Sequence, residues 1–199
     1  MEPQQQILEK AEGLFMRLGV KSVSMDDVAR ELGISKKTLY QYFPTKEDLI
    51  VRTLEFHRRC ERDQIAEVLA HADNALDEMV SLAKMAIRQL QKISPSLIFD
   101  LKKYHPDAFR FLEESHRKEA FEHIRQNLEK GISQGLYLPG IHVDIMARIH
   151  VQSFNLLLDE QLFPEDLPRA QILREYIMHY LRGLVTPVGL QYLEKYMHI

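Results

Sequence analysis

The sequence has one cysteine, Cys60, among its 199 residues. A single cysteine excludes an intramolecular disulfide and a zinc site built from cysteines alone. No run of apolar residues is longer than three, and the first residues, Met-Glu-Pro-Gln-Gln-Gln, carry neither the basic nor the apolar stretch of a secretion signal. We therefore expect a cytoplasmic protein with no membrane segment, in which Cys60 is a small buried hydrophobic residue.

Glycine is missing from residues 34–130, and the chain has only 4 threonines against 27 leucines. Leucine favours helices, whereas strands favour β-branched residues such as threonine, and a long stretch without glycine lacks the commonest turn residue. No alternating strand pattern, internal repeat or low-complexity segment competes with this interpretation. The composition predicts an all-α fold, and the helix boundaries along the chain give nine to ten helices.

Capping residues, glycines and prolines predict where these helices begin and end. Ser24 with Asp27, and Thr45 with Asp48, have the spacing of capping boxes. Ser35 can cap the helix after Gly33, and Ser94 is placed to cap a helix that begins with proline. The expected helices cover residues 7–18, 25–32, 36–43, 46–69, 75–93, 95–104, 106–134, 143–162 and 169–185, followed by a short helix opened by Thr186 and Pro187.

The two short helices around Gly33 form the most informative pattern. The turn of Gly33, Ile34 and Ser35 is three residues long, and Ala29 is small enough for the two helices to approach each other. An apolar seam joins them, made of Val28, Leu32, Leu39 and Phe43. This pattern predicts a helix-turn-helix.

The outward face of helix 36–43 is polar. With Leu39 and Phe43 facing inward, a helical period of 100° per residue places Lys37 and Gln41 on the opposite side. The flanks carry Lys36 and Tyr40 on one side and Thr38 and Tyr42 on the other. Residues 32–46 contain no acidic residue, so this surface offers donors suited to DNA phosphates and base edges.

Residues 24–49, SMDDVARELGISKKTLYQYFPTKEDL, closely resemble the DNA-binding signature of the tetracycline-repressor (TetR) family, and the match spans about residues 5–55. The resemblance implies that helix 36–43 enters the major groove, with Lys36, Lys37, Thr38 and Gln41 nearest the bases. It implies phosphate contacts for Tyr40, Tyr42 and Lys46, and for Ser24 and Met25 through backbone amides at a helix N-terminus. Ser35 belongs to the same DNA-binding set.

The resemblance also implies two domains: residues 1–46 bind DNA, and residues 47–199 form a helical regulatory and dimerisation domain. Helices 143–162 and 169–185 are apolar around much of their circumference, which predicts that they form the interface of a homodimer. The family likeness implies a cavity for a small apolar or amphipathic effector. Its candidate lining residues are Met85, Phe99, Tyr104, Phe109, Phe121, Met146, His150 and Phe154. Whether His150, Asn155 and Asp159 face the effector or the interface stays open.

An enzyme has little support in the sequence. Glu113 and His116 form a Glu-x-x-His motif, which is half of a carboxylate-bridged two-metal site, but a second such motif is missing. We expect no catalytic residues, metal or cofactor. The sequence predicts a ligand-responsive transcriptional regulator, in particular a repressor that binds a palindromic DNA operator as a homodimer. The alternatives are a helical protein-interaction module without DNA binding and a metal-dependent helical-bundle enzyme.

Overall fold

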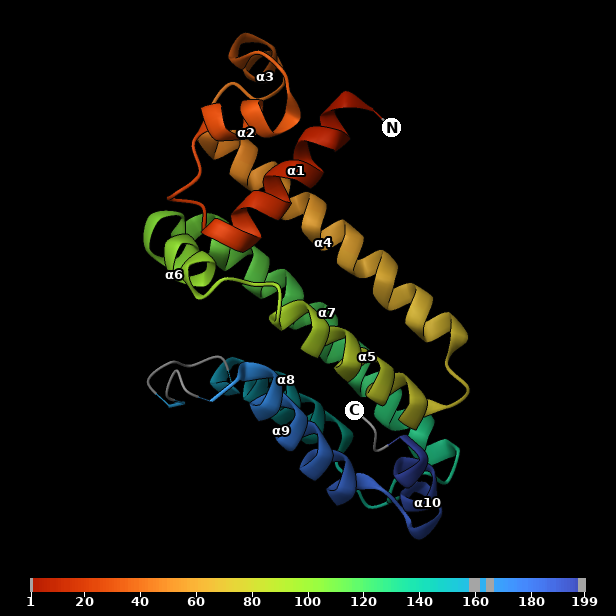
Figure 1. The fold of residues 1–199 in the computed structure, drawn as a ribbon. Coiled ribbons are helices and arrows are strands. Elements are labelled where there is room, and N and C mark those ends of the chain that lie inside the picture. The colour runs from red at the N-terminus through yellow and green to blue at the C-terminus, as the bar shows by residue number, and fades with distance from the viewer. Residues whose placement is uncertain (1, 158–161, 164–166, 197–199) are drawn as a thin grey trace. The chain divides into compact units, whose positions relative to one another are not determined.

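The computed structural model describes residues 2–157, 162–163 and 167–196, and these residues form ten α-helices and no strand (Figure 1). The chain divides into two compact units. The first comprises Met1–Gln64 and Lys92–Glu114, and the second Ile65–Gln91 and Ser115–Ile199. The helices are α1 (Pro3–Leu18), α2 (Met25–Leu32), α3 (Lys36–Tyr42), α4 (Lys46–His71), α5 (Ala75–Leu90), α6 (Pro95–Tyr104), α7 (Pro106–Ser133), α8 (Val143–Leu157), α9 (Arg169–Leu184) and α10 (Pro187–Tyr196).

The first unit is organised around the start of α4, where α1, α2 and α3 gather (Figure 1). Each of these helices buries one apolar face, and Leu97 and Leu101 of α6 complete the core. Its fully buried side chains include Val28, Leu39, Phe43, Leu49 and Ile50. Because α3 buries Leu39 among these residues, the opposite side of this short helix remains in solvent.

The second unit packs α5 against α9 and α10, and α8 against α9. A polar network lies inside this core. The buried Tyr137 hydroxyl donates toward the Ala75 carbonyl (3.2 Å) and Oδ1 of Asn127 (3.1 Å). Asn127 donates to the buried carboxylate of Glu78 at 2.8 Å, and Lys130 also pairs with Glu78. The network satisfies polar groups that would otherwise be costly to bury.

The predicted caps are confirmed at α2 and α3. Ser24 Oγ accepts from the amide of Asp27, and the Asp27 carboxylate accepts from the amide of Ser24, which completes the capping box. Ser35 Oγ accepts from the amide of Thr38 at 3.0 Å. Hydrogen bonds from Ser24 lower the pKa of Asp27, so this carboxylate stays ionised at the positive end of α2.

Two expected helix details differ between α5 and α6, and a third expected helix lies partly outside the described residues. The helix expected over residues 75–93 ends at Leu90, with Gln91 as its C-cap. Ser94 occupies the N-cap position of α6, but its hydroxyl bonds to Ser96 Oγ at 2.7 Å and caps no amide. The helix expected over 143–162 is described to Leu157, and residues 158–161, with Asp159, lie outside the described residues.

None of the helices described is long and apolar enough to cross a membrane.

Candidate nucleic-acid interface

The turn between α2 and α3 has the local geometry of a helix-turn-helix. Gly33 adopts the left-handed conformation (φ 67°), which suits glycine because it has no Cβ. The amide of Ile34 donates to the Ala29 carbonyl at 3.0 Å and closes the end of α2. Ser35 then caps α3, so the chain reverses between the two helices within three residues.

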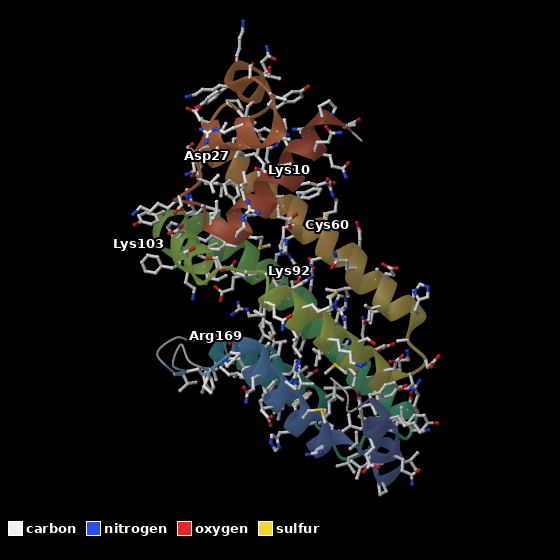
Figure 2. All side chains as sticks on the ribbon, viewed as in Figure 1. Lys10, Asp27, Cys60, Lys92, Lys103 and Arg169 are labelled. Atoms are coloured by element: carbon white, nitrogen blue, oxygen red, sulfur yellow. The ribbon has the colours of Figure 1, made fainter. Side chains whose placement is uncertain are left out.

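The predicted DNA-contacting residues of α3 and its flanks lie mainly on the solvent side of the first unit. Long side chains extend from α3 into solvent (Figure 2). Tyr40 and Tyr42 are 40% and 36% exposed, so their hydroxyls can reach a partner in solvent. The other exposed members of the set are Ser24, Ser35, Lys36, Lys37 and Gln41, whereas Thr38 and Lys46 are half-buried.

Met25 differs from the rest of the DNA-binding set because its side chain is buried in the core of the first unit. Only its backbone is therefore suited to the predicted phosphate contact. The neighbouring Ser24 uses its amide and its hydroxyl to donate to Asp27, at 2.9 and 2.6 Å. A phosphate at this helix end would compete with the Asp27 carboxylate for these donors.

An ion pair between α3 and α2, which the sequence did not predict, lies beside the outward face of α3. Lys36 Nζ lies 2.8 Å from Oδ1 of Asp26 on α2, and this contact raises the pKa of Lys36. The two residues are ten positions apart and sit on different helices, so no helical spacing rule connects them. In the free protein Asp26 therefore partly neutralises one of the two adjacent lysines of the outward face.

We expect Asp26→Asn to tighten binding to all DNA duplexes. The substitution removes a negative charge beside the phosphates and frees Lys36 to pair with DNA, so the dependence of affinity on salt becomes steeper by up to about one unit in the log–log slope. Fluorescence anisotropy titrations at several salt concentrations measure this change. Asp63→Asn makes the same charge change at an exposed position of α4. It is the control and should have a smaller effect on DNA affinity. Weaker binding by Asp26→Asn would contradict the expectation.

Lys46 and Tyr42 are held by backbone contacts at the two ends of the turn between α3 and α4. Lys46 Nζ donates to the Lys21 carbonyl at 3.5 Å, and burial lowers the pKa of Lys46. Arg52 donates to the Tyr42 carbonyl at 3.4 Å and lies over the Phe43 ring. Arg52 is a further cation beside the end of α3 that the sequence analysis did not select.

The eight candidate effector residues fall into both compact units. In the first unit, Phe99 and Tyr104 are exposed on α6 and Phe109 is half-buried against the core. Lys103 lies over both exposed rings, at 5.1 and 5.5 Å. The members in the second unit are Met85, which is buried, and Phe121, Met146, His150 and Phe154, which are half-buried.

A pocket of about 410 Å³ lies in the second unit and contains none of these eight residues. It is lined by Asp73, Asn74, Gln134, Leu136, Tyr192 and Tyr196. Two of its amides are already used locally, since Asn74 caps α5 and Gln134 accepts from the amide of Ala75 at 2.9 Å. The lining is more polar than the aromatic set that the sequence selected.

His150 is the member of the effector set with the strongest electrostatic perturbation. Burial lowers its pKa to about 4, from an ordinary value of 6.5. The unfolded chain therefore takes up a proton between pH 6.5 and 4 that the folded protein does not. The free energy of unfolding should fall as pH falls through this window, by at most about 3 kcal/mol from His150.

We expect His150→Phe to remove this part of the acid sensitivity, because phenylalanine keeps a ring and loses the titration. Urea unfolding at several pH values across the window measures the difference from the unmodified protein. His179→Phe, at an exposed position of α9, is the control for replacing a histidine by phenylalanine. If both variants respond to pH as the unmodified protein does, the neutral state assigned to His150 in the folded protein is wrong.

Among the described residues, no three His, Cys, Asp or Glu side chains gather closely enough to hold a metal ion. Cys60 is half-buried against the first core, and burial raises the pKa of its thiol. A thiol with a raised pKa is mostly protonated at neutral pH and is a weak nucleophile.

The capped helix pair and the polar outward face of α3 define a helix-turn-helix DNA-binding protein. A family model described as bacterial regulatory proteins, tetR family, matches residues 7–53, which include α2, the turn and α3. Over these residues the chain matches the DNA-binding segment of the TetR family of bacterial regulators.

Similar proteins extend the likeness beyond the matched segment. The HTH-type transcriptional regulator YvaF of Bacillus subtilis is 26% identical over 147 residues, which cover 70% of this chain and 73% of that protein. The HTH-type transcriptional repressor KstR2 of Mycolicibacterium smegmatis is 22% identical over 150 residues, 72% and 71% of the two chains. A TetR-family regulator from Agrobacterium tumefaciens, 18% identical, superposes with a TM-score of 0.72 over 92% of this chain and 98% of its own, so the two share a fold.

Proposed function

We propose that the protein is a ligand-responsive transcriptional repressor that binds a palindromic operator as a homodimer. The observation that supports this proposal most strongly is the division of α3 into two faces. The helix buries Leu39 and presents Lys37, Gln41 and two exposed tyrosines to solvent. A repressor is favoured because the similar KstR2 is one. The protein acts by binding and not by catalysis, and it works in the cytoplasm, where its DNA is.

Residues 1–46 bind DNA in this proposal, and residues 47–199 regulate and dimerise. Lys36, Lys37, Thr38 and Gln41 lie nearest the bases. Tyr40, Tyr42 and Lys46 contact phosphates, as do Ser24 and Met25 through their backbones. Base contacts set the preferred sequence, and phosphate contacts supply affinity that depends on salt.

The dimer uses α8, where an exposed apolar stripe supports it. Ile145, Ile149 and Leu156 are each about half exposed and lie on one face at helical spacing. The apolar residues of α9, in contrast, fill the core of the second unit itself: Ile172, Ile177, Leu181 and Leu184 are buried there. Exposed apolar side chains gathered on one face are a common mark of a protein interface.

Sedimentation velocity tests this interface directly. Ile149→Glu places a charge in the stripe and should give a monomer with reduced operator affinity. Val188→Glu, on the exposed side of α10, places the same charge outside the stripe and should leave the dimer intact. A dimer that survives Ile149→Glu would place the interface elsewhere.

Recovery of DNA from the organism's own genome tests the proposed function. Fragmented genomic DNA is mixed with the purified protein, and the bound fragments are sequenced. We expect a small set of promoter-proximal fragments that share an inverted repeat. Recovery of fragments without any shared sequence would overturn the proposal of an operator-specific regulator.

A further inference from the structure

Three rings meet where α8 packs against α9. The ring of His150 lies 4.5 Å from that of Tyr180 and 5.6 Å from that of Tyr176, measured between centroids, and the two tyrosine rings are 5.8 Å apart. The Tyr176 hydroxyl is 3.2 Å from Nδ1 of His150. All three residues belong to the second unit, so their geometry is set within one compact body.

The Tyr180 hydroxyl is buried without a hydrogen-bond partner among the described residues. The side chain is only 9% exposed and belongs to the core of the second unit. Tyr137 in the same core gives the contrast, because its hydroxyl reaches both the Ala75 carbonyl and Asn127. Buried polar groups nearly always have a hydrogen-bond partner, so the unpaired hydroxyl of Tyr180 indicates a place for an acceptor from a bound molecule.

The two rings that pack against Tyr180, those of His150 and Tyr176, carry no charge at neutral pH. Burial lowers the pKa of His150 to about 4, so the imidazole is neutral at neutral pH. Burial raises the pKa of Tyr176 and of Tyr180, which keeps both phenols protonated. Met146 and Phe154 are half-buried apolar neighbours packed against the same core. A charged group placed here would lose its hydration without gaining a counter-charge from these side chains.

We propose that the Tyr180 hydroxyl donates the hydrogen bond that holds the effector, and that the effector is an uncharged, mainly apolar molecule with a carbonyl-type oxygen. This inference rests on the proposed function, because it identifies the ligand chemistry of that regulator. A protonated phenol is a good donor to a neutral oxygen, and the rings of His150 and Tyr176 offer flat apolar surfaces beside it. A carboxylate ligand is disfavoured because the cluster supplies no cation.

Three small probes of similar shape test the inference: acetophenone, ethylbenzene and benzoate. Acetophenone has the carbonyl, ethylbenzene lacks it, and benzoate carries a charge. Their dissociation constants are measured by ligand-observed NMR with the full-length protein. Tyr180→Phe removes only the unpartnered hydroxyl and should leave folding intact. Tyr137→Phe, a second buried tyrosine in the same core, is the matched control.

We expect Tyr180→Phe to lower the affinity for acetophenone relative to ethylbenzene by about two- to tenfold, the contribution of one hydrogen bond. Tyr137→Phe should leave this ratio unchanged, and benzoate should bind more weakly than acetophenone. The inference is overturned if the ratio is the same in both variants and the unmodified protein, if benzoate binds best, or if neither neutral probe binds.

DNA binding without any probe separates this inference from the proposed function. Both tyrosine variants should bind operator DNA as the unmodified protein does, because neither residue lies in the first unit. Normal operator binding combined with an unchanged probe ratio would overturn the assignment of Tyr180 alone. Failure of the unmodified protein to prefer any DNA sequence would overturn the proposed function.

Discussion

Lys37→Ala and Gln41→Ala are each expected to weaken binding to the operator by about 1 to 3 kcal/mol and to relax the preference at one or two base pairs. Both side chains are exposed on the side of α3 opposite Leu39. Binding to a scrambled duplex should change much less. The measurement is a titration of each variant against both duplexes at several salt concentrations.

Lys46→Ala and Tyr42→Phe test the proposed phosphate contacts in the same titrations. Both residues lie at the edge of the proposed interface, so their loss should weaken all duplexes alike and leave the ranking of sequences unchanged. Lys46→Ala should also lower the salt slope by about one unit. If Lys46→Ala abolished sequence preference while Lys37→Ala and Gln41→Ala preserved it, the proposed orientation of α3 in the groove would be wrong.

Leu39→Ala is expected to destabilise the first unit by about 2 to 5 kcal/mol, because it leaves a cavity at a fully buried position of α3. DNA binding should be lost together with the folded helix. Gln41→Ala, two positions along the same helix, should change the free energy of unfolding by less than about 0.5 kcal/mol. Urea unfolding followed by circular dichroism measures both.

The two variants together separate folding from recognition. Leu39→Ala should lose stability and DNA binding, whereas Gln41→Ala should keep its stability and bind the operator more weakly, with a relaxed preference at one or two base pairs. A stable Leu39→Ala protein with normal DNA binding would contradict the buried position of this leucine. Equal losses of stability in both variants would contradict the division of α3 into an inner and an outer face.

Local signals made the helix-turn-helix predictable. The capping box of Ser24 and Asp27, the turn at Gly33 and the cap at Ser35 act within a few residues, and α2 has the expected bounds. The third helix ends at Tyr42, one residue before the predicted end, because Phe43 turns to an extended conformation before Pro44.

Contacts between distant segments were not predictable from spacing. The pair of Asp26 and Lys36 depends on the packing of two helices, and the buried carboxylate of Asp100 accepts from the amide of Lys21, 79 positions away. Helical periodicity shows that a residue lies on the apolar face of its helix, but it does not show which hydrophobic core that face joins. For this reason the sequence assigns aromatic residues such as Phe99 and Phe154 to one expected effector cavity, although the structure places them in different units.

The symmetry and stoichiometry of operator binding test the central claim most directly. The inverted repeat recovered from genomic DNA is compared with a duplex that carries only one of its halves, and the mass of each complex is measured by analytical ultracentrifugation. The account predicts two protomers on the full repeat and much weaker binding to the half-site. In the Ile149→Glu variant, the full repeat and the half-site should bind with similar affinity. A single protomer that binds full and half sites equally well would contradict a dimeric regulator that reads DNA through paired α3 helices.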